Sequence, residues 1–144
     1  MIKNFIKNER TANITFDDGR RMTLEIVDSE GRIDVEFYED EEMENQISGA
    51  TFAFTDESVD VESDEFIPNP NEGERYLLRA MDVPRGFERM GIGRFILEWV
   101  IEEYNTIIWA RNPFETRLGD GSDLTENGLE FVRAMQASEL VDDW

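Results

Sequence analysis

The spacing of apolar residues changes once along this 144-residue chain, and that change constrains the fold more than any other feature of the sequence. Between residues 12 and 54, apolar and polar side chains alternate in short runs, which are separated by turn signals at 17–19 and 29–31. Alternation with a period of two predicts β-strands with one buried face. We therefore expect a meander of four strands, at 12–16, 22–27, 33–38 and 47–54.

After residue 75 the spacing of apolar residues predicts strands that alternate with helices. Residues 76–83 are almost continuously apolar, which predicts a central strand. The apolar residues between 92 and 100 recur at helical spacing and predict an amphipathic helix of about 14 residues. We expect a short strand at 106–110 and then a second helix, which starts from a capping box at 123–126.

Acidic residues outnumber basic ones by 34 to 14, which gives a formal net charge of -20. The excess is concentrated in residues 33–74, which hold 15 acidic and no basic residues, whereas residues 75–111 hold six arginines against five acidic residues. This balance argues against nucleic-acid binding through a basic face and against docking on anionic membranes. It leaves room for an anionic ligand at the arginine-containing segment.

The acidic half of the chain has three explanations. The first, which we rank highest, is a solvated surface, since 2 Lys against 12 Arg is a ratio found in proteins from high-salt sources. The second is attraction of a cationic acceptor, such as a polyamine or a Lys-rich tail. The third is imitation of a nucleic acid, in which the chain would occupy the groove of a basic partner protein.

The chain contains neither Cys nor His. Thiol nucleophiles, disulfides, zinc sites built from Cys or His, and Ser-His-Asp triads are therefore excluded. No signal peptide is visible, and no apolar run approaches the roughly 20 residues that a membrane helix needs. We expect a cytoplasmic protein that does not enter a membrane, with one domain over 1–144 and a mobile acidic connection at 56–74.

The segment 83–94 carries the strongest indication of chemistry. It leads from a strand through a loop into a helix, and Gly91 and Gly93 stand at the first turn of that helix. Glycine lets a ligand approach the backbone closely, and the free amides of a helix N-terminus attract phosphate. Three arginines lie in the same segment and favour an anion there: Arg85, Arg89 and Arg94.

This segment resembles the central motif of the GCN5-related N-acetyltransferases. In that family a valine at a strand end is followed by an aromatic and basic loop, and then by Gly-x-Gly opening a helix; Val83, Phe87, Gly91 and Gly93 stand at the matching positions. The resemblance covers residues 76–137. It implies an α+β fold in which a twisted mixed, mainly antiparallel sheet is flanked by helices. It also implies acetyl-CoA as cosubstrate and an amine acceptor, for which a cationic compound is expected.

Position by position, the resemblance implies a coenzyme site made of the strand end, the loop and the first helical turn. The backbone near 81–83 would orient the pantetheine and polarise the thioester carbonyl, and the amides of 89–94 would hold the pyrophosphate. The implied coenzyme-binding residues are Met81, Val83, Arg85, Arg89, Met90, Gly91, Ile92, Gly93 and Arg94.

Direct attack by an amine requires a base, and in a chain without His the expected base is a carboxylate or a water that a carboxylate holds. Asp82 is the first candidate because it ends the central strand, and Asp56 and Glu57 come next. Tyr104, near the end of the first helix, is a candidate proton donor.

Two positions depart from the family pattern. Glu88 stands where the family prefers Gln or Arg, and Phe131 stands where it often has a tyrosine that serves as general acid. Coenzyme binding is therefore better supported than turnover. The alternative hypothesis is a non-enzymatic acidic binding protein, either a nucleic-acid mimic or a catalytically silent domain of the same family.

Overall fold

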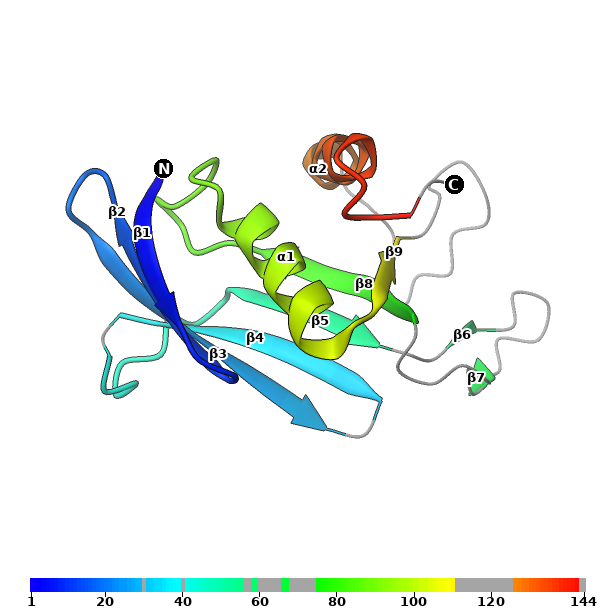
Figure 1. The fold of residues 1–144 in the computed structure, drawn as a ribbon, viewed down its shortest axis with the longest axis horizontal. Coiled ribbons are helices and arrows are strands. Elements are labelled where there is room, and N and C mark those ends of the chain that lie inside the picture. The colour runs from blue at the N-terminus through cyan, green and yellow to red at the C-terminus, as the bar shows by residue number, and fades with distance from the viewer. Residues whose placement is uncertain are drawn as a thin grey trace.

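In the part of the chain that the structure describes, seven strands form one curled sheet, accompanied by a two-stranded ladder and two helices (Figure 1). The computed structural model describes residues 1–29, 31–39, 41–55, 58–59, 66–67, 75–110 and 126–142. The elements are β1 (Ile2–Lys7), β2 (Thr11–Phe16), β3 (Arg21–Ser29), β4 (Arg32–Tyr38), β5 (Thr51–Thr55), β6 (Ser58–Val59), β7 (Phe66–Ile67), β8 (Arg75–Asp82), α1 (Ile92–Tyr104), β9 (Ile107–Trp109) and α2 (Glu126–Ala137).

The strands of the large sheet lie in the order β1-β2-β3-β4-β5-β8-β9. Neighbours from β1 to β8 are antiparallel, and β9 lies parallel to β8. A parallel pair needs a crossover connection, and α1 supplies it. The predicted order of a meander followed by strand, helix, strand and helix is therefore confirmed.

Two parts of the predicted strand pattern were wrong. Residues 2–7 form the edge strand β1, which the alternation did not reveal because neither of its faces is fully buried. Residues 47–50 belong to a turn in which Gly49 has a φ of 78°, so β5 begins only at Thr51. The greater part of the predicted capping box at 123–126, and most of the acidic connection at 56–74, lie outside the described residues.

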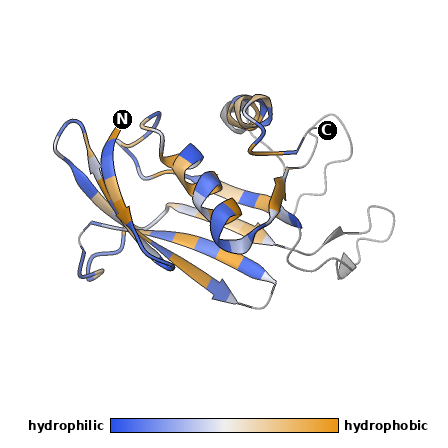
Figure 2. Ribbon diagram, viewed as in Figure 1, coloured by the Kyte–Doolittle hydropathy of each residue, from blue (hydrophilic) through white to orange (hydrophobic). Residues whose placement is uncertain are grey.

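The core lies between the concave face of the sheet and α1. Along β2, β3 and β4 apolar residues alternate with polar ones, and the apolar set is buried (Figure 2). The helix buries seven of its 13 residues, including Phe95, Ile96 and Trp99. Its exposed side carries Arg94 and Glu98, one turn apart. Because one helix fills most of the concave face, its own position is tightly determined.

The curl of the sheet brings distant strands onto the same helix. Phe5 of β1 packs edge-on against Phe95 with ring centroids 4.9 Å apart, and Asp28 of β3 accepts a hydrogen bond of 2.8 Å from Tyr104 at the other end of α1. Strand twist of constant hand produces such a curl when the strands are long enough to wrap a helix.

The expected fold, a sheet flanked by helices as in the GCN5-related N-acetyltransferases, is contradicted. The structure is a curled, mostly-strand half-barrel of seven strands with two short helices. The physical reason lies in the first half of the chain, where alternation of period two leaves no stretch with the 3.6-residue spacing that a flanking helix requires. Among the described helices, none is long and apolar enough to cross a membrane.

The contrast between two isoleucines on adjacent strands tests where the core lies. Ile14 is 1% exposed and Ile6 is 70% exposed. We expect Ile14→Ala to lower the free energy of unfolding by about 2–5 kcal/mol, because it removes buried methyl groups and leaves a cavity. The matched change Ile6→Ala should alter it by less than about 0.5 kcal/mol. Urea denaturation of both variants measures the difference, and equal effects would contradict the assigned core.

Candidate functional site

One edge of β8 is left open by the way the sheet ends. The last strand, β9, pairs with residues 75–77 of β8, so the 78–82 edge faces no other described strand on that side. On the opposite side, the register with β5 shifts by one residue between the pairs Ala53–Ala80 and Phe54–Leu78. Such a β-bulge bends a strand, and it bends β8 beside the open edge.

A cavity of about 930 Å³ lies against this open edge. It is bounded by β8 and the loop after it, by the N-terminus of α1, and by α2. Its apolar wall includes Phe52, Leu78, Phe131 and Met135. The volume lies at the upper end of the range for small-molecule and cofactor sites, which is about 300–1,000 Å³.

The structure brings most of the predicted coenzyme residues together in this cavity. Those that line it are Met81, Val83, Arg89, Gly91, Ile92, Gly93 and Arg94. The other two, Arg85 and Met90, belong to the same loop but do not line the cavity. A segment chosen for its sequence motif therefore contributes most of its residues to the lining of one cavity.

The N-terminus of α1 opens into the cavity. Gly91 is its N-cap, with a left-handed φ of 87°, and no side chain caps the helix. The amides of Ile92, Gly93 and Arg94 fall in the first turn, where a helix has no carbonyl of its own to pair with. These amides and the positive end of the helix dipole favour an anion at this wall.

The cavity combines charges of both signs. Its charged members are three arginines and three carboxylates: Arg79, Arg89, Arg94, Asp82, Glu88 and Glu130. Arg94 also forms an ion pair with Glu98 one turn along α1, at 3.0 Å. The strong negative charge of the whole chain is therefore not repeated in this cavity.

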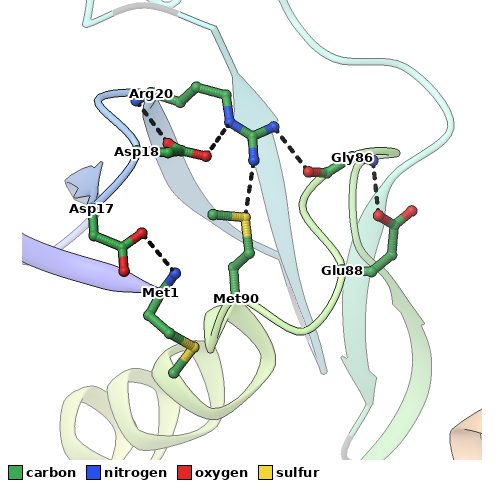
Figure 3. Close-up of polar contacts among 7 residues, drawn as sticks. All are labelled: Met1, Asp17, Asp18, Arg20, Gly86, Glu88 and Met90. Atoms are coloured by element: carbon green, nitrogen blue, oxygen red, sulfur yellow. Dashed lines mark hydrogen bonds and ion pairs between the residues drawn. The ribbon is translucent and has the colours of Figure 1, made fainter.

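Glu88, which departs from the family pattern, is turned onto its own loop. One of its carboxylate oxygens accepts a hydrogen bond of 2.8 Å from the backbone N–H of Gly86 (Figure 3). This hydrogen bond gives the carboxylate a partner within its own loop. It therefore reduces the repulsion that an isolated carboxylate would exert on a bound anion.

Sequence reasoning missed Arg20, which holds this loop from outside. It lies between β2 and β3, beyond the turn at 17–19, and its guanidinium donates a hydrogen bond of 2.8 Å to the carbonyl oxygen of Gly86 (Figure 3). No sequence signal indicates this contact, because the two residues are 66 positions apart. Its partner Asp18 accepts hydrogen bonds from the Arg20 backbone and side chain, which lower the pKa of the Asp18 carboxyl.

The candidate proton donor Tyr104 lies at the far end of α1, about 18 Å along the helix from the cavity. Its hydroxyl donates to Asp28, which also forms an ion pair with Arg10. Burial and the hydrogen bond to Asp28 raise the pKa of Tyr104. These contacts join α1 to the sheet, and Tyr104 does not line the cavity.

Of the three candidate bases, Asp82 is the one that lies among the described residues. Asp82 is exposed, lines the cavity and stands at the end of β8, as expected. Asp56 and Glu57 lie outside the described residues. Glu130 of α2 is another exposed carboxylate on the cavity wall, besides Asp82 and Glu88, and nothing in its sequence setting distinguishes it from other surface glutamates.

Comparison with known protein families, with characterised proteins and with solved structures finds no match for this chain. Within the described ranges, no group of three Asp or Glu side chains is placed to hold a metal ion.

The contact between the two helices at the cavity gives a testable prediction. A Cβ added to Gly93 would lie 2.7 Å from a ring carbon of Phe131, which is closer than side-chain carbons approach. We expect Gly93→Ala to lower the free energy of unfolding by about 1–3 kcal/mol, as overpacking does. In a Phe131→Ala background the same change should cost little, because the obstacle is gone and alanine favours helix. Denaturation of the four proteins completes the cycle, and an equal cost in both backgrounds would contradict this packing.

Proposed function

We propose that the cavity binds acetyl-CoA and that the chain transfers the acetyl group to an amine. The observation that carries the proposal is the convergence of seven predicted coenzyme residues on one cavity beside the open edge of β8. The proposal rests on the motif and on this cavity, and it does not depend on the helix-flanked fold that the structure contradicts.

The strand edge at the cavity suits the amide-containing arm of the thioester. A strand edge that no described strand covers can pair with an amide-containing chain, in the way that peptides add to sheet edges. The 78–82 edge of β8 would receive the amides of pantetheine, while Leu78, Met81 and Phe131 cover its apolar atoms. Backbone amides near Val83 are the groups that would polarise the thioester carbonyl.

The charge of the cavity suits a pyrophosphate at the opposite wall. The first turn of α1 lies there, and Arg89 and Arg94 are among the lining residues. Arg89 has a φ of 59°, a left-handed conformation that is uncommon for a residue with a side chain. Strained residues of this kind cluster at ligand-binding sites.

Asp82 is the residue that we assign as base. Its carboxylate would accept a proton from the amine, directly or through a water, as the amine nitrogen bonds to the acetyl carbon and the bond from that carbon to sulfur breaks. The thiolate that leaves takes up a proton from solvent, since no described tyrosine lines the cavity. The three cavity carboxylates favour a cationic amine as the acceptor.

The binding step predicts a thermal shift. Acetyl-CoA or CoA at 100 times its dissociation constant should stabilise the chain by about 2.7 kcal/mol. Arg89→Asn should weaken binding about tenfold, because it removes a charge-assisted contact while asparagine tolerates the left-handed conformation. Arg21→Asn is the matched control, since Arg21 is exposed and lies outside the cavity lining.

The absence of any thermal shift with millimolar acetyl-CoA or CoA would contradict the proposed function. The alternative hypothesis, a non-enzymatic acidic binding protein, would then gain support if the chain retained a basic DNA-binding protein in a pull-down. Binding of CoA without thiol release over a panel of amines would instead indicate a catalytically silent coenzyme-binding domain.

The turnover step predicts different roles for Asp82 and Glu130, two of the three exposed carboxylates that line the cavity. Asp82→Asn should lower kcat at least about a hundredfold, as loss of a general base does, and leave the affinity for CoA within about twofold. Glu130→Gln is the matched control and should retain most of kcat. Thiol release from acetyl-CoA measures both, and the chain, which contains no cysteine, adds no thiol background. A large loss in Glu130→Gln with little change in Asp82→Asn would show that the base was wrongly assigned.

A further inference from the structure

The loop between β8 and α1 adopts a conformation that its own backbone does little to maintain. Residues 84–91 contain three left-handed positions, with φ of 92° at Gly86, 59° at Arg89 and 87° at Gly91. Within the loop the described backbone–backbone hydrogen bonds amount to one, from Phe87 N–H to the carbonyl oxygen of Pro84 at 3.0 Å. A loop of this kind relaxes unless contacts from elsewhere determine it.

Arg20 supplies three such contacts with one side chain. It donates hydrogen bonds to the carbonyl oxygen of Gly86 at 2.8 Å and to the sulfur of Met90 at 3.2 Å (Figure 3). Its guanidinium also lies over the ring of Phe87, with 4.2 Å between the central carbon and the ring centroid. The three contacts are spread over residues 86–90, and together they fix both ends of that stretch.

The guanidinium of Arg20 is itself held in place. Asp18 accepts a hydrogen bond of 2.8 Å from its Nε and another of 3.0 Å from the Arg20 backbone N–H (Figure 3). The planar fork of an arginine can serve Asp18 on one side and the loop on the other, and it can stack on an aromatic ring at the same time. A lysine offers a single ammonium, which cannot bind Asp18, bind the loop and stack on the ring at the same time.

We propose that Arg20 is a positioning residue for the coenzyme site, and that it acts by holding the 84–91 loop in the shape that receives the pyrophosphate. Arg20 does not line the cavity, so its effect passes through the loop and not through contact with the ligand. This inference rests on the proposed function.

The test compares the wild-type chain with Arg20→Ala, Arg20→Lys and Arg21→Ala. Arg21 is the matched control, because it is exposed, carries the same charge and directly follows Arg20 in the sequence. Calorimetry with CoA should show affinity about tenfold weaker in Arg20→Ala, little recovery in Arg20→Lys and a change below twofold in Arg21→Ala. Full recovery in Arg20→Lys would overturn the proposal, because long-range charge would then account for the effect.

A second measurement needs no ligand and separates this inference from the proposed function. Hydrogen exchange of the 85–91 amides in the free protein should be at least about tenfold faster in Arg20→Ala than in the wild type, with no change in Arg21→Ala. Unchanged exchange, or unchanged CoA affinity, in Arg20→Ala would overturn the inference even if the wild type binds CoA. If the wild type does not bind CoA, the proposed function fails and the coenzyme role of Arg20 fails with it, whereas exchange still decides whether Arg20 holds the loop. Should Arg20→Ala not fold, Asp18→Ala, which removes the carboxylate that accepts both hydrogen bonds from Arg20, gives the same two readouts.

Discussion

Enclosure of α1 by the curled sheet is the constraint on which the rest of the structure depends. The helix contacts β1 through Phe95 and the end of β3 through Tyr104, so it can neither rotate nor slide without opening the core. At its first turn, Gly93 lets Phe52 and Phe131 approach from two sides. The N-terminus of α1 is thereby fixed beside the open edge of β8, and the cavity lies between them.

The electrostatics of the chain follow from where its charges are placed. A formal net charge of -20 weighs against phosphate ligands in general, but the excess is carried by residues 33–74. Asp34 and Glu36 of that stretch lie on β4, and neither lines the cavity. The cavity itself combines arginines, carboxylates and helix amides, a set that can accept an anion at one wall and a cation at another.

Much of the secondary structure could be predicted because it depends on local spacing. Alternation placed β2, β3 and β4, and helical spacing placed α1. The edge strand β1 escaped because it buries no continuous face, and the predicted fourth strand begins later than expected, at Thr51, because the backbone turns at Gly49. The helix-flanked sheet expected from the family was wrong, since the resemblance covers only residues 76–137 and the first half of the chain carries no helical spacing.

The sequence by itself determined that a strand runs through a glycine-containing loop into a helix, because turn residues and apolar periodicity act over a few positions. It therefore identified Gly91, Gly93 and Arg89 as neighbours of one site. Only the tertiary structure decided that this segment faces the open edge of β8, that Glu130 joins it, and that Arg20 holds its loop. Those contacts join residues dozens of positions apart, and the curl of the sheet, which no local pattern encodes, brings them together.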